Sequence, residues 1–95
     1  MLFEWDEAKN AGNKQKHGVS FELASLVFQD PFVLSKFDGR FAHEERWLSI
    51  GMVGGETIIF VAHTIRDEGN HEEIIRIISA RKATPGERRR YFDER

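Results

Sequence analysis

The order of apolar and polar positions predicts a short strand, two helices, a run of antiparallel strands and a closing helix. An apolar and aromatic run predicts the first strand at residues 2–5. Asp6 is a suitable N-cap and Gly18 a suitable stop for a helix between them. Ala8 and Ala11 are the inward contacts that this polar helix offers, so the rest of it is expected to face solvent. The exposed positions are then Lys9, Asn13, Lys14, Lys16 and His17.

A second helix is predicted after Ser20, which is a suitable N-cap. Its apolar residues recur at helical spacing and need a core to pack on, and they are Phe21, Ala24, Val27 and Phe28. Asp30-Pro31 ends this helix. Residues 32–37 are predicted to form a strand and residues 38–43 a polar turn.

A β-hairpin is predicted from residues 45–53 and 57–64, because the first of these segments alternates with a period of two. One face carries Leu48, Ile50 and Met52, and the other carries Trp47, Ser49 and Gly51. Gly54-Gly55 supplies the positive φ values that a two-residue hairpin turn requires.

The last third of the chain is predicted to contain a loop, a strand and a helix. Residues 66–71 are polar and form the loop, and residues 73–80 form the strand, with Ile75 and Ile77 on one face. A capping box with proline at the first helical position marks the final helix, and it consists of Thr84, Pro85 and Glu87. The predicted fold is α+β, an antiparallel meander of about four strands with helices packed on one face.

The composition limits the possible classes of protein. A chain of 95 residues is expected to form a single domain, 1–95, because a second hydrophobic core could not be built. Cysteine is absent, which excludes disulfides and cysteine-ligated metal sites. The apolar runs are too short to span a bilayer, and the acidic N-terminal segment is unlike a signal peptide. We therefore expect a cytoplasmic protein without membrane contact.

Charge is unevenly distributed along the chain. The formal net charge is −2, which argues against a surface uniformly suited to nucleic acid. Between Arg76 and Arg90, however, six residues are basic and one is acidic. This local patch could bind a polyanion, or it could be the solvated face of a terminal helix.

RNA cleavage is a chemistry that these residue types could support. Attack by the 2′-hydroxyl needs a proton acceptor, a proton donor for the 5′-oxygen and cations beside the phosphorus. His17, next to Lys16 at the end of the first helix, is a candidate because the helix dipole favours a protonated imidazole there. The alternative is that His17 only stabilises the helix end.

Three arginines are candidates for binding a phosphate. Arg66 lies beyond one predicted strand, while Arg76 and Arg81 flank the last strand. If the two strands pair, these side chains could meet at one end of the sheet and hold a phosphate through paired hydrogen bonds. Alternatively, Arg66 and Arg81 form exposed ion pairs with acids such as Asp67 or Glu87.

Other polar residues give weaker indications. Ser79 and Tyr91 could donate hydrogen bonds at such a site, or they could be structural. His43, His63 and His71 show neither an HExxH motif nor a helical i, i+4 pair, so no metal site is expected. A glycine-rich phosphate loop and a GxSxG motif are also absent.

Two blocks of sequence carry a family resemblance. The first comprises Phe3-Glu4-Trp5-Asp6, Lys9, Asn13, Lys16-His17-Gly18-Val19-Ser20-Phe21-Glu22, Ala24, Phe28 and Asp30-Pro31. The second comprises Glu45-Arg46, Gly51, Val61, His63-Thr64, Arg66, Ile75-Arg76-Ile77-Ile78-Ser79-Ala80-Arg81-Lys82-Ala83, Arg88 and Tyr91. In this order, and over essentially the whole chain, these residues closely resemble the toxins of the BrnT family.

The resemblance implies a RelE-like fold, cleavage of RNA and arrest of translation. It also implies neutralisation by a cognate BrnA-like antitoxin, a ribbon-helix-helix protein that dimerises, carries two toxins and represses its own operon. Contact with operator DNA would then occur only through the complex with the antitoxin. One departure is residues 67–73, a loop that looks longer and more acidic than the connection usual in the family.

The leading hypothesis is a metal-independent endoribonuclease that uses no cofactor. Its predicted catalytic residues are His17, Arg66, Arg76, Arg81 and Tyr91, and its predicted RNA-binding residues are Lys9, Lys16, Lys82 and Arg88. The first alternative is a catalytically inactive module that binds the antitoxin and acts in operon autoregulation. The second is an interaction domain whose charged helices are ordinary solvated surfaces.

Overall fold

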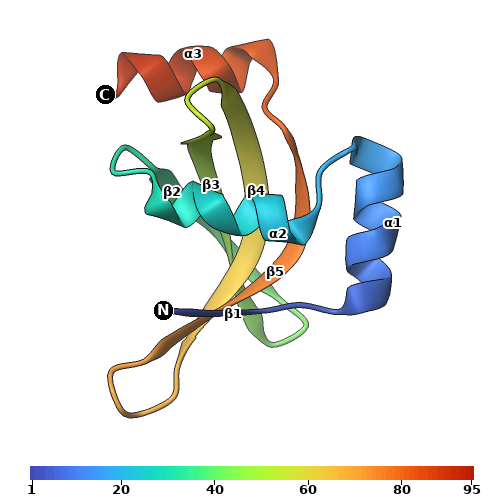
Figure 1. Cartoon of the computed structure of the whole chain (residues 1–95). Helices are drawn as coiled ribbons and strands as arrows, with labels where there is room; N and C mark the ends of the chain where they lie inside the picture. The colour runs from blue at the N-terminus through green and yellow to red at the C-terminus, as the bar shows by residue number, and fades with distance from the viewer.

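Five strands form one mixed sheet in the computed structural model, which describes all 95 residues (Figure 1). The strands are β1 (Leu2–Glu4), β2 (Leu34–Phe41), β3 (Glu44–Val53), β4 (Thr57–Asp67) and β5 (Glu73–Lys82). The helices are α1 (Glu7–His17), α2 (Phe21–Ser25), the 3₁₀ helix η1 (Leu26–Gln29) and α3 (Pro85–Asp93). The predicted α+β class is confirmed. No helix is both long and apolar enough to cross a membrane.

The sheet has the order β1-β5-β4-β3-β2. Strands β2 to β5 form the predicted antiparallel meander, whereas β1 pairs in parallel with β5. The prediction of about four strands in a purely antiparallel sheet is therefore short by one strand. Sequence patterns could not show this pairing, because β1 has three residues and its partner lies about seventy residues further along the chain.

The hydrophobic core lies between the sheet and the helical segment α2–η1. Phe21, Ala24 and Val27 are fully buried there against Ile59 and Val61 of β4, as the helical spacing predicted. Helix α3 lies instead across the end of the sheet (Figure 1). The helices therefore do not all pack on one face.

Several predicted boundaries are wrong in detail. β2 runs into the predicted polar turn and ends at Phe41, because Ala42 and His43 alone make the turn to β3. β4 extends to Asp67, so the loop after it is shorter than predicted. Val53 pairs with Thr57, so the turn after β3 has three residues, not two.

The face of β3 that meets the helices is the one with Ser49 and Gly51, both of which are buried. A Cβ atom at Gly51 would lie 2.7 Å from Cγ1 of Val27, closer than atoms can approach. Glycine is therefore needed here for η1 to approach the strand. Leu48 and Ile50 lie on the opposite face of the sheet and are half-buried.

Helix α1 is attached through asparagines, and the predicted inward alanines are exposed. The Oδ1 atom of Asn10 accepts a hydrogen bond from the backbone N–H of Phe21 at 2.8 Å. The side chain of Asn13 donates to the carbonyl of Ala80 at 2.7 Å and accepts from its N–H at 3.2 Å. Ala80 lies on β5 beyond the stretch that pairs with β1, and Asn13 satisfies both of its backbone groups there. The prediction that Asn13 faces solvent is therefore wrong.

The predicted helix caps are confirmed. Asp6 accepts hydrogen bonds from two backbone N–H groups at the start of α1, and Gly18 adopts the left-handed conformation at its end, with φ of 72°. Thr84 and Glu87 form the capping box of α3. These caps fix where α1 leaves β1 and where α3 leaves β5.

Candidate functional site

A cleft opens where the two hairpins of the sheet diverge. Pairing between β3 and β4 ends at Arg46 and Thr64, although both strands continue beyond these residues. The space between their separate ends is a cleft of about 330 Å³. It is lined by Arg40, His43, Glu44, Glu45, Thr64, Ile65, Arg66 and Arg76.

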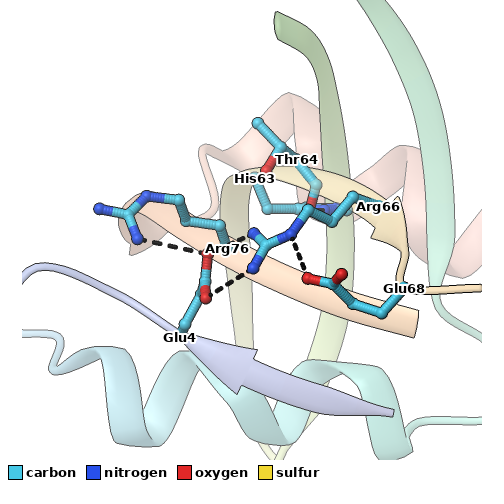
Figure 2. A network of polar contacts seen from close by, with 6 residues as sticks. All are labelled: Glu4, His63, Thr64, Arg66, Glu68 and Arg76. Atoms are coloured by element: carbon cyan, nitrogen blue, oxygen red, sulfur yellow. Dashed lines mark hydrogen bonds and ion pairs between the residues drawn. The ribbon is translucent and has the colours of Figure 1, made fainter. Parts of the chain in front are cut away.

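Two arginines of this cleft meet at one carboxylate (Figure 2). Arg66 binds Glu4 through both terminal nitrogens, at 2.5 and 3.0 Å, and Arg76 reaches the same carboxylate at 3.4 Å. The parallel pairing of β1 with β5 places Glu4 directly opposite Arg76. A third contact joins Nε of Arg66 to Glu68 at 2.9 Å.

Both partners of the main ion pair stay charged at neutral pH. The hydrogen bond from Arg66 holds the pKa of the Glu4 carboxyl below its usual range. The hydrogen bonds to Glu4 and Glu68 raise the pKa of the Arg66 guanidinium. The side chains of Arg66 and Arg76 are 46% and 39% exposed, so an anion from solvent can reach them.

Arg46 extends this cationic surface across the sheet. Arg46 lies opposite Thr64, which in turn lies opposite Arg76, so the three residues form one row across three strands. The guanidinium of Arg46 lies 4.8 Å from the ring centre of Phe41, and its buried Nε has no hydrogen-bond partner. The sequence reasoning gave Arg46 no role, since the row exists only in the paired sheet.

His63 lies on the core side of β4 and is fully buried. Its Nε2 is 2.7 Å from the hydroxyl of Ser49, which is 2.8 Å from that of Ser35. The ring packs edge-on against Phe28, with 4.9 Å between centres. Burial lowers the pKa of His63 to about 4, so the ring is neutral and structural.

Comparison with known proteins identifies the family. A family model described as the ribonuclease toxin BrnT of type II toxin-antitoxin systems matches residues 5–87. The chain belongs to the BrnT family. A similar solved structure is the 1.1 Å crystal structure of the Brucella abortus ribonuclease toxin BrnT, which is 30% identical in sequence. It covers 88% of this chain and 99% of its own, with a TM-score of 0.62. No protein with a curated description matches in sequence.

Membership of the BrnT family confirms the resemblance noted in the sequence, and the fold matches a BrnT structure. Ribonuclease toxins of type II systems act with an antitoxin, so an antitoxin partner follows for this chain. Family membership alone does not identify the residues that act on RNA. Those residues have to be inferred from where the side chains lie in the fold.

The expected meeting of three arginines at one end of the sheet is wrong for this BrnT chain. Arg81 lies opposite Phe60, roughly 15 Å along β5 from Arg76. Its guanidinium stacks on the Phe60 ring at 4.1 Å and binds Glu87 at 2.7 and 3.0 Å. The alternative ion pair with Glu87 is therefore the observed one.

Tyr91 is also distant from the cleft. It is the buried residue of α3, and its hydroxyl donates a hydrogen bond to Asp30 at 2.5 Å. Burial and this hydrogen bond raise the pKa of Tyr91 to about 12. Since Asp30 also accepts from the N–H of Met52 at 2.8 Å, these contacts join α3 to the core.

The remaining predicted residues lie on the outer surface and do not line the cleft. His17 and Lys16 are exposed at the end of α1 furthest from β1 (Figure 1). Lys9 lies near the start of α1, while Lys82 ends β5 and Arg88 is on α3. The structure thus brings together Arg66 and Arg76 of the predicted set, and leaves the others apart.

Proposed function

We propose that this chain is a metal-independent endoribonuclease that holds the scissile phosphate of RNA with Arg66 and Arg76. The observation that supports this proposal is that two guanidiniums on neighbouring strands bind one carboxylate at an open cleft. Carboxylates and phosphates present similar oxygen pairs to arginine. A pair of arginines that binds a carboxylate can therefore also bind a phosphate.

The Glu4 carboxylate has to yield part of this site to a phosphate. Ion pairs between exposed side chains contribute about 0 to 1 kcal/mol each. Glu4 is 34% exposed and its arginine partners more so, which places these ion pairs near that regime. A phosphate dianion or diester can therefore compete for Arg76, which holds Glu4 by the longest of the three contacts.

RNA would be attracted to the surface by cations outside the cleft. We assign this role to Lys9, Lys16, Lys82 and Arg88. Because these contacts would be made to phosphates, binding should weaken as salt rises. Because the net charge of the chain is −2, this salt dependence would come from the local basic surface and not from the protein as a whole.

The partner that we propose is a BrnA-like ribbon-helix-helix antitoxin, which would neutralise the toxin and connect it to operator DNA. Cleavage of RNA in the cytoplasm would arrest translation. The family description names a type II toxin-antitoxin system, which supports a protein antitoxin.

A second candidate function is favoured by the same ion pairs. Glu4 and Glu68 together accept hydrogen bonds from all three guanidinium nitrogens of Arg66. A site closed in this way would suit an inactive module that binds the antitoxin and acts in operon autoregulation.

The test is cleavage of a defined single-stranded RNA by the purified chain, with and without EDTA. Cleavage that survives EDTA supports the metal-independent ribonuclease. If the folded chain leaves both free RNA and ribosome-bound RNA intact but binds its antitoxin, the inactive module is the correct function.

A further inference from the structure

The four histidines of the chain occupy very different positions. His63 is buried with its Nε2 bound to Ser49, and His17 is at the far end of α1. His71 lies in the loop between β4 and β5 and does not line the cleft. His43 lines the cleft that also contains Arg66 and Arg76. It is therefore the imidazole that a phosphate held in this cleft would face.

The turn that presents His43 is conformationally unusual. Phe41 pairs with Glu44, so Ala42 and His43 alone connect β2 to β3. Both have positive φ, 49° and 67°, in a conformation that glycine or asparagine normally supplies in hairpin turns. Strained residues of this kind persist where surrounding pairing enforces them, and they gather at functional sites.

The charged groups that line the cleft with His43 come from four strands, β2 to β5. On its own hairpin, Glu44 is adjacent, and Arg40 binds Glu45 at 2.9 Å. The cleft lining also includes Arg66 on β4 and Arg76 on β5, which bind Glu4, and Arg66 also binds Glu68. Arg40 and Glu45 pair with each other, so on this side of the cleft the exposed His43 imidazole and the Glu44 carboxylate have no ion-pair partner. Of these two side chains, imidazole is the type suited to donate a proton near neutral pH.

We propose that His43 is the catalytic proton donor to the 5′-oxygen leaving group of RNA. The proposal rests on the ribonuclease function proposed above. The 2′-oxygen forms a bond to the adjacent phosphorus, and its proton passes to water. The bond from phosphorus to the 5′-oxygen breaks, and that oxygen takes a proton from the His43 imidazolium. The products are a 2′,3′-cyclic phosphate and a 5′-hydroxyl, with no oxidation or reduction.

This assignment replaces His17 and Tyr91 as proton-transfer groups. The Tyr91 hydroxyl donates a hydrogen bond to Asp30 in a partly buried contact, and His17 is separated from Arg76 by the length of α1. Imidazole is suited to exchange protons near neutral pH, and a positioned donor of this type accelerates such reactions by about 10²- to 10⁴-fold.

The test uses His43→Asn, because asparagine tolerates a positive φ but cannot donate a proton as imidazolium does. The matched control is His71→Asn, since His71 is an exposed histidine with φ of 65° outside the cleft. Each variant is assayed on one RNA and on the same RNA with sulfur in place of the bridging 5′-oxygen. The sulfur leaves as a thiolate and needs no proton donor. Circular dichroism and RNA affinity verify that both variants fold and bind.

We expect His43→Asn to cleave ordinary RNA about 10²- to 10³-fold more slowly, with little change in affinity. On the sulfur-containing RNA its rate should match the wild-type rate, and His71→Asn should match wild type on both substrates. Equal slowing of His43→Asn on both substrates, or normal cleavage of ordinary RNA, would overturn the assignment. Absence of cleavage by the wild-type chain would instead overturn the ribonuclease function itself.

Discussion

His63 shows how a residue that looks reactive in a sequence can be structural. The histidine spacing raised only the question of a metal site. In the fold, its ring is sealed between Phe28 and the hydroxyl of Ser49. No local pattern distinguishes this histidine from His43, because burial depends on which face of β4 meets η1. The sequence could name both residues but not separate their roles.

Burial of neutral His63 should make stability depend on pH. Its pKa is about 4 in the folded chain against 6.5 when unfolded. Between these values the unfolded chain binds a proton that the folded chain does not, so the free energy of unfolding should fall as pH drops. The fall should approach roughly 3 kcal/mol between pH 7 and 4.

Urea denaturation at a series of pH values measures this fall. His63→Gln should be less stable at pH 7 but should lose most of the slope between pH 6.5 and 4. His17→Gln, which changes an exposed histidine, should keep it. The carboxylates with lowered pKa, such as Glu4 and Asp30, begin to lose their stabilising contribution only as pH falls below about 5, and most of that loss lies below this window. An unchanged slope in His63→Gln would show that the ring is not buried as a neutral group.

Arg81 provides a second test at the scale of one residue. Arg81→Met should destabilise the chain by about 1–2 kcal/mol, because the contacts with Phe60 and Glu87 are lost. The cleavage rate of the folded fraction should remain within a few-fold of wild type. Thermal denaturation and cleavage assays at matched folded concentration separate these effects. A large rate loss at unchanged stability would return Arg81 to the catalytic site.

At the scale of elements, the ends of helices were predictable and the inner faces of α1 were not. Caps are local, since Asp6 and Thr84 bind backbone N–H groups within three residues. Hydropathy assigned the alanines of α1 to the core, yet Asn10 and Asn13 face it. Their amides satisfy backbone groups far along the chain, and hydropathy does not register such a match.

Asn13→Ala tests the attachment of α1 to β5. Loss of the amide leaves both backbone groups of Ala80 without this partner, so the free energy of unfolding should fall by about 2–3 kcal/mol. Lys14→Ala, on the same helix but exposed, should change it by less than about 0.5 kcal/mol. Urea denaturation compares the two. Equal stabilities would show that α1 is held by other contacts.

At the scale of the whole molecule, the candidate site depends on contacts that join distant parts of the chain. Glu4 comes from the start, Arg66 from β4 and Arg76 from β5. The arginines could be named from the sequence because their residue type suits phosphate. Their meeting at Glu4, and the separation of Arg81, depend on the register of β1 and β4 with β5, which local periodicity does not determine.

Glu4→Gln tests whether this carboxylate competes with RNA. The substitution removes one negative charge from between the two arginines, so affinity for a short single-stranded RNA should rise by about 3- to 10-fold at low salt. Fluorescence anisotropy measures it, with Glu94→Gln on the exposed end of the chain as the charge-matched control. Weaker binding in Glu4→Gln would mean that Glu4 orients the arginines more than it blocks them.

The central claim is that RNA is cleaved in the cleft that holds Arg66 and Arg76. The most direct measurement is the single-turnover cleavage rate in EDTA of Arg76→Gln beside Arg89→Gln, an exposed change of equal charge on α3. We predict that Arg76→Gln is slower by about 10²- to 10³-fold and that Arg89→Gln retains the wild-type rate. Equal rates in the two variants would contradict the account and place the chemistry elsewhere on the molecule.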